Sequence, residues 1–314
     1  MERKNALLIA GGGTLGTYTA KELLRLGHNV DIICPEEKVS DNEHLTFHQA
    51  LASEELLKEL FKKKHYHAIV NFIHYPEVEG YKDMHKFLCD NTEQLVFVSS
   101  YRAYADLQHP ITENAPFLLD TMEDEAFLKE EKYAVSKAKA EKFIREESNT
   151  KNWTIVRPVI SFSDKRLDIV SIGGRVVLEG KPVYLPENVK NITAGLDWAG
   201  NSGKLIANLL FKEETLGEAY TISSAQNLTW GEVAELYTEL AGTEFKWIDK
   251  DEWLQDESIQ GKRWVYWGAV YDRFFDRTID NSKVLKATGL KKEDFKSIKE
   301  GLEIEIAIAK GDIK

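Results

Sequence analysis

The stretch Ala6-Leu7-Leu8-Ile9-Ala10-Gly11-Gly12-Gly13-Thr14-Leu15-Gly16 decides the fold of this chain. Its first five residues form a short apolar run, which indicates a buried strand. A helical pattern follows over residues 17–26 and ends at Gly27, a suitable C-cap. Residues 30–34 then predict a second strand. A glycine turn therefore joins a strand to a helix and a further strand within about thirty residues.

Gly11, Gly13 and Gly16 fit the spacing G-x-G-x-x-G. Glycines at these places allow a tight turn and let backbone N–H groups approach a pyrophosphate at the helix N-terminus. The alternative is a glycine-rich turn that only lets the strand and the helix pack. The flanking strand and helix favour dinucleotide binding.

The cofactor that this turn would hold is NAD or NADP. NAD sites usually place an acidic residue at the end of the second strand. Asp31 has that spacing but lies inside the strand, whose end is Cys34, followed by Glu36 and Glu37. No arginine follows the strand to meet a 2′-phosphate, and Lys38 is the one nearby cation. The choice stays open, with a slight lean to NAD.

The first half of the chain alternates strands and helices. Further strands are expected at residues 45–47, 68–73, 95–98 and 153–158, and helices at 53–63, 81–89 and 131–147. This rhythm predicts an α/β fold with a doubly wound parallel sheet (Rossmann type) over residues 1–160. Ligands then bind outside the carboxyl ends of the strands.

The rhythm breaks after Pro158, where glycines and prolines punctuate the chain. Residues 161–314 are expected to form a smaller α+β substrate-binding domain, with residues 191–222 returning to the first domain. A helix is expected at 196–210, a strand at 219–222, and a helix behind the capping box of Thr229 and Glu232.

Tyr133 and Lys137 stand four residues apart in the expected helix 131–147, so they share one face. A free phenol has a pKa near ~10, too high for a base at neutral pH. A neighbouring ammonium favours the phenolate and lowers that pKa. The pair thus predicts an acid/base device for a substrate hydroxyl. The alternative is an ordinary exposed helical face.

Composition narrows the choice of partners and compartment. The 314 residues are 43% hydrophobic and 30% charged, with a net charge of −11, so nucleic acid is a poor partner. The two cysteines, Cys34 and Cys89, form no Cys-x-x-Cys pattern, which favours a reducing compartment. The apolar run 6–10 is too short for a signal peptide or a membrane span. We expect a cytoplasmic protein without a membrane partner.

Histidine pairs offer weak metal signals. His44 and His48, and His65 and His67, have ligand-like spacings but no matching carboxylates or thiolates, so we expect no metal site. His74, at the ligand-bearing edge of the sheet, is either a substrate contact or a hydrogen-bonded histidine. Arginines can clamp a phosphate by their planar guanidinium groups, or form salt bridges on this acidic surface. The candidates are Arg102, Arg263, Arg273 and Arg277.

The chain resembles the extended, atypical short-chain dehydrogenase/reductase family, the NAD-dependent epimerases and dehydratases of nucleotide sugars. Besides the glycine turn and the Tyr-x-x-x-Lys, the resemblance rests on these motifs in order: Val96-Phe97-Val98-Ser99-Ser100, Tyr104, Arg157-Pro158, Gly217-Glu218-Ala219-Tyr220, Asp280-Asn281-Ser282-Lys283 and Gly289-Leu290. Each motif is modest, but their order and spacing over nearly the whole chain are specific.

The resemblance implies a catalytic triad of Ser100, Tyr133 and Lys137. Tyr133 would exchange the proton of a substrate hydroxyl while hydride passes to the nicotinamide, Lys137 would hold the nicotinamide ribose, and Ser100 would bind the reacting oxygen. The implied cofactor contacts are Gly11, Gly13, Thr14, Leu15, Gly16, Cys34, Phe72, Ile73 and Pro158. Arg102 and Arg273 are our substrate contacts, and the resemblance allows a homodimer through the helix of Tyr133.

The chain departs from the family at three places. Ala10 stands where the first glycine belongs, Cys34 replaces the acidic residue after the second strand, and no asparagine matches the crossover helix between Gly80 and Cys89. We expect an NAD(P)-dependent epimerase, dehydratase or reductase acting on a nucleotide sugar or a similar hydroxyl compound. The alternative is a dinucleotide-binding sensor or scaffold without catalysis; RNA binding, as in chloroplast relatives, is disfavoured by the negative charge.

Overall fold

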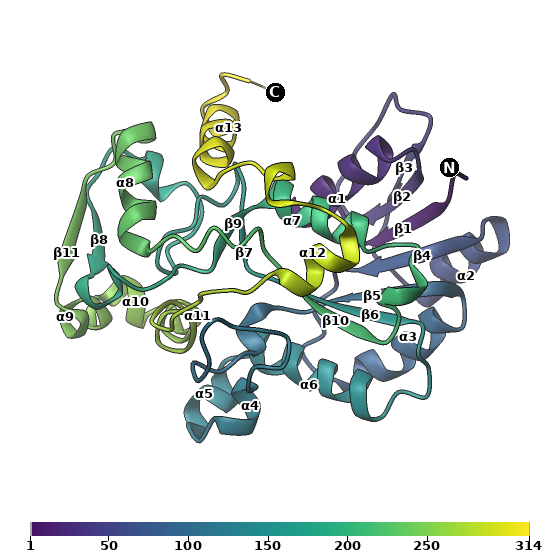
Figure 1. Ribbon diagram of the computed structural model, residues 1–314, viewed down its shortest axis with the longest axis horizontal. Helices are drawn as coiled ribbons and strands as arrows, with labels where there is room; N and C mark the ends of the chain where they lie inside the picture. Colours follow the sequence, from purple (N-terminus) through teal and green to yellow (C-terminus); the bar gives the residue numbers. More distant parts are fainter. Residues whose placement is uncertain (1, 314) are drawn as a thin grey trace.

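A seven-stranded parallel sheet forms the centre of the computed structural model, which describes residues 2–313 (Figure 1). Its strand order is β10-β6-β5-β4-β1-β2-β3. The strands are β1 (Asn5–Ile9), β2 (Asn29–Cys34), β3 (Leu45–Gln49), β4 (Tyr66–Asn71), β5 (Thr92–Val98), β6 (Trp153–Pro158) and β10 (Glu218–Ile222). From β1 the strands follow in chain order to β3 on one side, and from β4 they follow in chain order to β10 on the other, so the order switches between β1 and β4. This sheet confirms the predicted doubly wound α/β fold.

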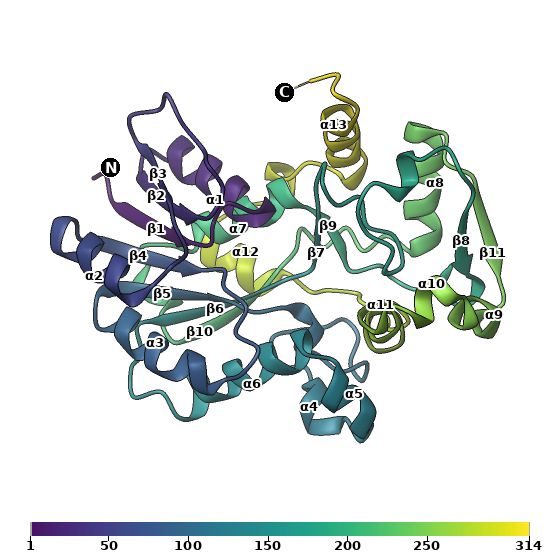
Figure 2. The same cartoon turned by 180° about the vertical axis from the view of Figure 1, so that it is seen from behind.

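Helices cover both faces of the sheet, as Figure 2 shows from behind. Side chains alternate along a strand, so Leu8 packs under α1 and α7 while Leu7 packs under α2 and α3. These helices, with α6 and α12, are α1 (Thr14–Arg25), α2 (Glu54–Lys63), α3 (Glu79–Cys89), α6 (Tyr133–Glu146), α7 (Ala199–Asn208) and α12 (Ser282–Thr288). Both faces of each central strand are buried, which explains the continuous apolar runs of the sequence.

The predicted helix 196–210 is wrong at its start. Residues Leu196–Trp198 form the short strand β9, which pairs with β7 (Ile160–Phe162), and α7 begins only at Ala199. The buried Asp197 carboxylate explains the boundary, because it accepts hydrogen bonds from the Trp198 N–H and the Asn201 side chain. Such a bond pattern holds a helix start rather than a helix interior.

The C-terminal part has its own core against the carboxyl edge of the sheet. The predicted capping box of Thr229 and Glu232 is confirmed at the start of α8. The remaining elements are β8 (Val183–Pro186), β11 (Phe245–Ile248), α4 (Leu118–Thr121), α5 (Glu125–Glu130), α8 (Trp230–Ala241), α9 (Lys250–Gln255), α10 (Glu257–Gln260), α11 (Arg263–Gly268) and α13 (Ile298–Lys310). A π-helical turn, Ala269–Arg273, continues α11, and short 3₁₀ turns lie at Tyr101–Ala103, Val176–Leu178, Glu187–Val189, Glu213–Thr215 and Lys292–Asp294.

One close helix contact fixes the return of the chain to the sheet. A Cβ added at Gly203 of α7 would lie 2.6 Å from the backbone of Tyr18 in α1, so only glycine lets these helices approach so far. After α7 the chain continues to β10, which pairs in parallel with β6. Between residues 2 and 313, none of the helices combines the length and apolar character that crossing a membrane requires.

Candidate active site

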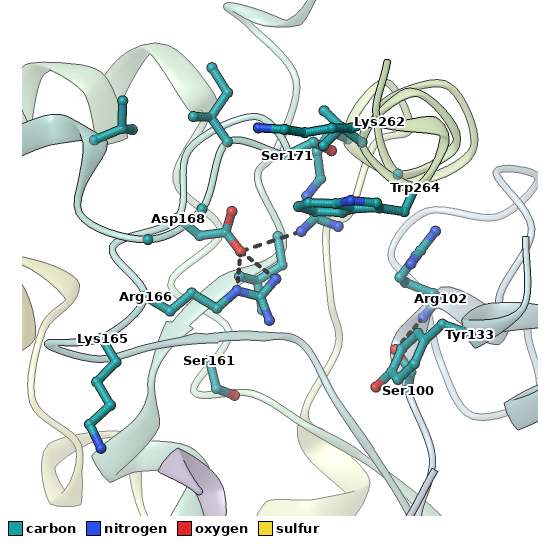
Figure 3. A pocket seen from close by; sticks show the side chains of 18 of the residues that line it. Ser100, Arg102, Tyr133, Ser161, Lys165, Arg166, Asp168, Ser171, Lys262 and Trp264 are labelled. Atoms are coloured by element: carbon teal, nitrogen blue, oxygen red, sulfur yellow. Dashed lines mark hydrogen bonds and ion pairs between the residues drawn. The ribbon is translucent and has the colours of Figure 1, made fainter. Parts of the chain in front are cut away.

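A cavity of about 1430 Å³ runs along the carboxyl ends of the central strands, beneath the C-terminal part. Ala10, Phe72, Ser100 and Pro158 line it from the sheet side, each just beyond the end of β1, β4, β5 or β6 or at that end. Residues of α11 and of the loop after β7 close it from the other side (Figure 3). The cavity therefore lies where a doubly wound sheet binds its ligands.

The glycine turn contains two kinds of glycine. A Cβ at Gly16 would lie 2.2 Å from the Gly11 carbonyl oxygen, and a Cβ at Gly11 would lie 2.6 Å from the Leu8 side chain. These two are needed for packing. Gly13 differs, because a Cβ there would meet nothing within 4 Å, and Gly13 caps α1 without a side-chain acceptor. The first N–H groups of α1 are thus available to an anion.

The cofactor contacts expected from the sequence divide into two groups. Gly13, Thr14, Leu15, Gly16, Phe72 and Pro158 line the cavity. The others, Gly11, Cys34 and Ile73, are not part of its wall. Gly11 lies beneath Gly16, and Cys34 is buried with its side chain against Gly12.

Beyond β2, two charged side chains approach the glycine turn. The Lys38 ammonium lies 2.5 Å from the Gly12 carbonyl oxygen. A carboxylate oxygen of Glu36 lies 3.1 Å from the place of a Gly12 Cβ. Together with the open Gly13 and the uncapped start of α1, these groups fit a dinucleotide, with the pyrophosphate at α1 and a ribose near Glu36.

Ser100 and Tyr133 meet at the cavity, although 33 positions separate them in the printed sequence. Tyr133 is the first residue of α6 and keeps 40% of its surface exposed, with its hydroxyl turned to the cavity in Figure 3. Ser100 follows β5, and its hydroxyl accepts a hydrogen bond from the Arg102 N–H at 3.2 Å. The arrangement presents a phenol and a hydroxyl to the same ligand.

The Lys137 ammonium, which we expected to act on the Tyr133 phenol, makes its hydrogen bonds to the backbone. Its side chain is buried, and its ammonium donates to the carbonyl oxygens of Val98 at 2.6 Å and Ile73 at 3.2 Å. Burial lowers the pKa of Lys137 to about 7.

The pKa of Tyr133 is raised, first by burial. Arg102 and Arg166 are the groups whose positive charge counteracts that rise, and the Ser100 hydroxyl does the same. Arg102 has its guanidinium carbon 5.9 Å from the centre of the phenol ring. The positive charges of Arg102 and Arg166 therefore favour the phenolate of Tyr133.

A buried ion pair supports the wall behind Ser100. Arg157, in β6, and Glu141, in α6, lie 2.6 Å apart with almost no exposed surface. The Glu141 carboxylate also accepts from Ser99, and Arg157 donates to the Tyr104 hydroxyl at 2.7 Å. This network ties α6, β5 and β6 together, so it fixes Tyr133 relative to Ser100 and Pro158.

Arginines and acids gather in and behind the cavity wall on both sides of Tyr133, in what we call the arginine cluster. Its members are Arg102, Arg166, Arg273, Arg277, Glu131, Asp168 and Asp272. Arg102 and Arg273 were expected as substrate contacts, and both line the cavity. Sequence reasoning missed Arg166 and Asp168, although their charged pattern follows directly on a short strand.

The histidines lie away from this wall. His74 Nε2 and the Ser136 hydroxyl share a hydrogen bond of 2.7 Å. The ring centre of His74 lies 5.3 Å from that of Tyr133. His65 and His67 lie at the amino end of β4, and Glu93, a carboxylate that the sequence did not reveal, lies at the amino end of β5. The possible ligand atoms of these three residues are within 4.8 Å of one another. One ring nitrogen of His67 already accepts from the Asn5 N–H.

The sequence and the fold of this chain are similar to those of known proteins. Residues 65–171, about a third of the chain, match the family model NAD_binding_4, described as male sterility protein. No curated protein matches the sequence. Among solved structures, the UDP-glucose 4-epimerase of Thermus thermophilus in complex with NAD is 17% identical, with a TM-score of 0.67, over 98% of this chain and 100% of that one.

Two further solved structures have a similar fold. The UDP-glucose 4-epimerase of Stenotrophomonas maltophila with bound NAD and formylated UDP-arabinopyranose gives a TM-score of 0.69 at 13% identity, over 99% of this chain and 98% of that one. The terminal R domain of the myxalamid PKS-NRPS biosynthetic pathway gives a TM-score of 0.65 at 17% identity, over 99% of this chain and 92% of that one. At such identities the similarity shows the fold, and this fold is the one expected from the resemblance stated above.

Proposed function

We propose that this protein is an NAD(P)-dependent enzyme of the extended short-chain dehydrogenase/reductase type, which transfers hydride to or from a hydroxyl-bearing carbon of a nucleotide sugar. The observation that carries the proposal is the meeting of Tyr133 and Ser100 in a cavity that continues to the open glycine turn at Gly13. A sensor needs the turn, but it has no need of a phenol and a hydroxyl at the far end.

The bound nicotinamide would supply or accept the hydride. This chain's part is to move the proton and to hold the reacting oxygen. The Tyr133 phenol takes the proton of the substrate hydroxyl, or returns it, while Ser100 hydrogen-bonds the same oxygen. Lys137 holds the backbone carbonyls of Val98 and Ile73 in place, and Pro158 and Phe72, which line the cavity, would exclude water from a bound nicotinamide.

The nucleotide part of the substrate is supported by the size and the mouth of the cavity. A volume of about 1430 Å³ exceeds the ~300–1,000 Å³ of ordinary small-molecule pockets, and so accommodates a dinucleotide and a second ligand together. Trp264 and Tyr184 line its mouth with 66% and 49% of their surfaces exposed. Exposed aromatic faces of this kind stack on a base. Two of the similar structures are UDP-glucose 4-epimerases.

The test is hydride transfer itself. The purified protein is incubated with NAD⁺ or NADP⁺ and UDP-glucose, UDP-N-acetylglucosamine or UDP-glucuronate, and followed by nicotinamide absorbance and by NMR of the sugar. We expect reduced nicotinamide, an epimer or a dehydrated sugar with at least one of them. Cofactor binding without any such product over the panel would favour the sensor instead.

A further inference from the structure

We propose that the substrate carries a carboxylate close to its reacting carbon, and that Arg166 and Arg102 bind this carboxylate beside Tyr133. This inference rests on the function proposed above and names the class of sugar that the site selects: an acidic sugar, such as a uronate, rather than a neutral hexose. The evidence is the composition and geometry of the arginine cluster.

The first observation is position. Arg102 follows Ser100 by two residues, and its guanidinium carbon lies 5.9 Å from the Tyr133 ring centre. Arg166 approaches from the opposite wall, with 54% of its side chain exposed while it lines the cavity (Figure 3). Its charge also acts on the phenol. An anion between these two guanidinium groups therefore lies next to the reacting hydroxyl.

The second observation is charge. Of this cluster, three guanidinium groups and two carboxylates line the cavity, Arg102, Arg166 and Arg273 against Glu131 and Asp168, so its wall carries one surplus positive charge. The exposed charges at the cavity mouth balance each other: Lys165, Lys181 and Lys262 against Glu179, Glu252 and Asp256. Arg102 and Arg166 lie close enough to Arg273 to disfavour its charge. A monovalent carboxylate would neutralise the surplus, and a planar guanidinium matches its two oxygens.

The third observation is a set of buried polar atoms without partners. Asp168, Ser171 and Arg273 are each at least 95% buried and line the cavity, yet Asp168 Oδ1, Ser171 Oγ and Arg273 Nε find no hydrogen-bond partner among residues 2–313. Leaving such atoms buried and unpaired is unfavourable, since each has given up its hydrogen bonds to water. A ligand with an acidic group and hydroxyls supplies both kinds of partner once these side chains reorient toward it.

The fourth observation is backbone strain at the same place. Val170 and Ser171 have φ values of 40° and 63°, in the left-handed region that side chains other than glycine rarely adopt. The tight turn from Ile169 to Ile172 holds them there by two backbone hydrogen bonds. Ser171, in this turn, lines the cavity together with Arg273. Strain retained beside a ligand cavity is a mark of a binding site.

The experiment compares ligands that differ by one carboxylate. Calorimetric titrations of the protein, with and without saturating NAD⁺, use UDP-glucuronate, UDP-glucose and UDP, and in addition free D-glucuronate and D-glucose. We expect UDP-glucuronate to bind about 10–100-fold more tightly than UDP-glucose, the range that a charge-assisted hydrogen bond provides. D-glucuronate should likewise bind better than D-glucose, whether or not the uridine nucleotide contributes.

Variants locate the effect. Arg102→Gln should remove most of the preference for UDP-glucuronate while it changes UDP-glucose affinity about threefold or less, and Ser171→Ala should reduce the preference in part. Arg25→Gln, on an exposed arginine at the far end of α1, is the matched control and should leave both affinities unchanged. A titration of NAD⁺ into each protein shows separately whether the dinucleotide site is intact.

Two results would overturn the inference. Equal affinity for each acidic and neutral pair would show that no carboxylate is recognised. Equal weakening of UDP, UDP-glucose and UDP-glucuronate in Arg102→Gln would show that the guanidinium groups hold the diphosphate instead. Neither result depends on NAD⁺ binding or on turnover, so both are distinct from a failure of the proposed function.

Discussion

The Lys137 ammonium lies 2.6 Å from the carbonyl oxygen of Val98, at the end of the strand that leads into Ser100. The helix of Tyr133 is thereby joined to the strand of Ser100 through a buried amine. The phenol that we propose as acid/base is thus positioned by Lys137, while the positive charges of Arg102 beside it and of Arg166 from the opposite wall favour its ionised form. The predictions below separate positioning, cofactor binding and proton transfer.

Lys137→Met should change the pH dependence of stability. Burial lowers the pKa of Lys137 to about 7, whereas an unfolded chain binds this proton up to about pH 10.4. Between these values the unfolded chain binds more protons, so wild-type stability rises with pH there, and the variant lacks this term. From pH 7 to 9.5, wild type should gain about 3 kcal/mol relative to the variant in urea unfolding without cofactor. A constant difference over this range would show that the amine is not buried uncharged.

Glu141→Gln should destabilise the fold strongly. The change leaves Arg157 buried without its carboxylate, and breaking one partner of a buried ion pair costs about 3–5 kcal/mol. The control is Glu239→Gln, which breaks the exposed pair with Lys299 and should cost about 1 kcal/mol or less. Denaturant unfolding measures both. Similar small losses in the two variants would contradict the role given to the buried network.

Gly13→Ala and Gly16→Ala should fail in different ways. An added methyl at Gly16 meets the Gly11 carbonyl, so this variant should lose about 2 kcal/mol of stability or more. At Gly13 the methyl meets no atom of residues 2–313 within 4 Å, and it would enter the space that we propose for the pyrophosphate. That variant should keep its thermal midpoint and lose NAD⁺ affinity about tenfold or more. Unchanged NAD⁺ affinity in a folded Gly13→Ala would place the dinucleotide elsewhere.

NAD⁺ should bind better than NADP⁺, and Glu36 should be the cause. Its carboxylate lies near Gly12 beyond β2, where it can accept from a ribose hydroxyl and repels a 2′-phosphate. Glu36→Gln should narrow the ratio of the two dissociation constants about tenfold, as measured by calorimetry. A wild-type preference for NADP⁺ would instead assign Lys38 to the phosphate.

The sheet was predictable because its strands are buried on both faces and read as continuous apolar runs. The glycine turn and the Tyr133 helix were predictable from spacing alone. The C-terminal part was not, because short elements such as β9 depend on tertiary pairing. The helix α13 has a capping box, Ser297 to Glu300, that could have revealed it.

The residues of the cavity wall show more clearly what the sequence alone could not predict. Arg102, Arg166 and Arg273 come together from three separate segments, and no periodicity in the sequence links them. The direction of the Lys137 side chain depends likewise on carbonyls from β5 and the loop after β4. Spacing places a residue on a helix face, but only the fold decides which groups meet it.

The most direct test of the central claim compares Tyr133→Phe with wild type in single-turnover hydride transfer. The reactions use NAD⁺ and whichever UDP-sugar wild type converts, and NAD⁺ affinity is titrated on the same preparations. We predict a rate lower by about 10²–10⁴-fold with NAD⁺ affinity unchanged, since the phenol moves a proton and does not hold the dinucleotide. A Tyr133→Phe variant that transfers hydride at the wild-type rate would contradict the account.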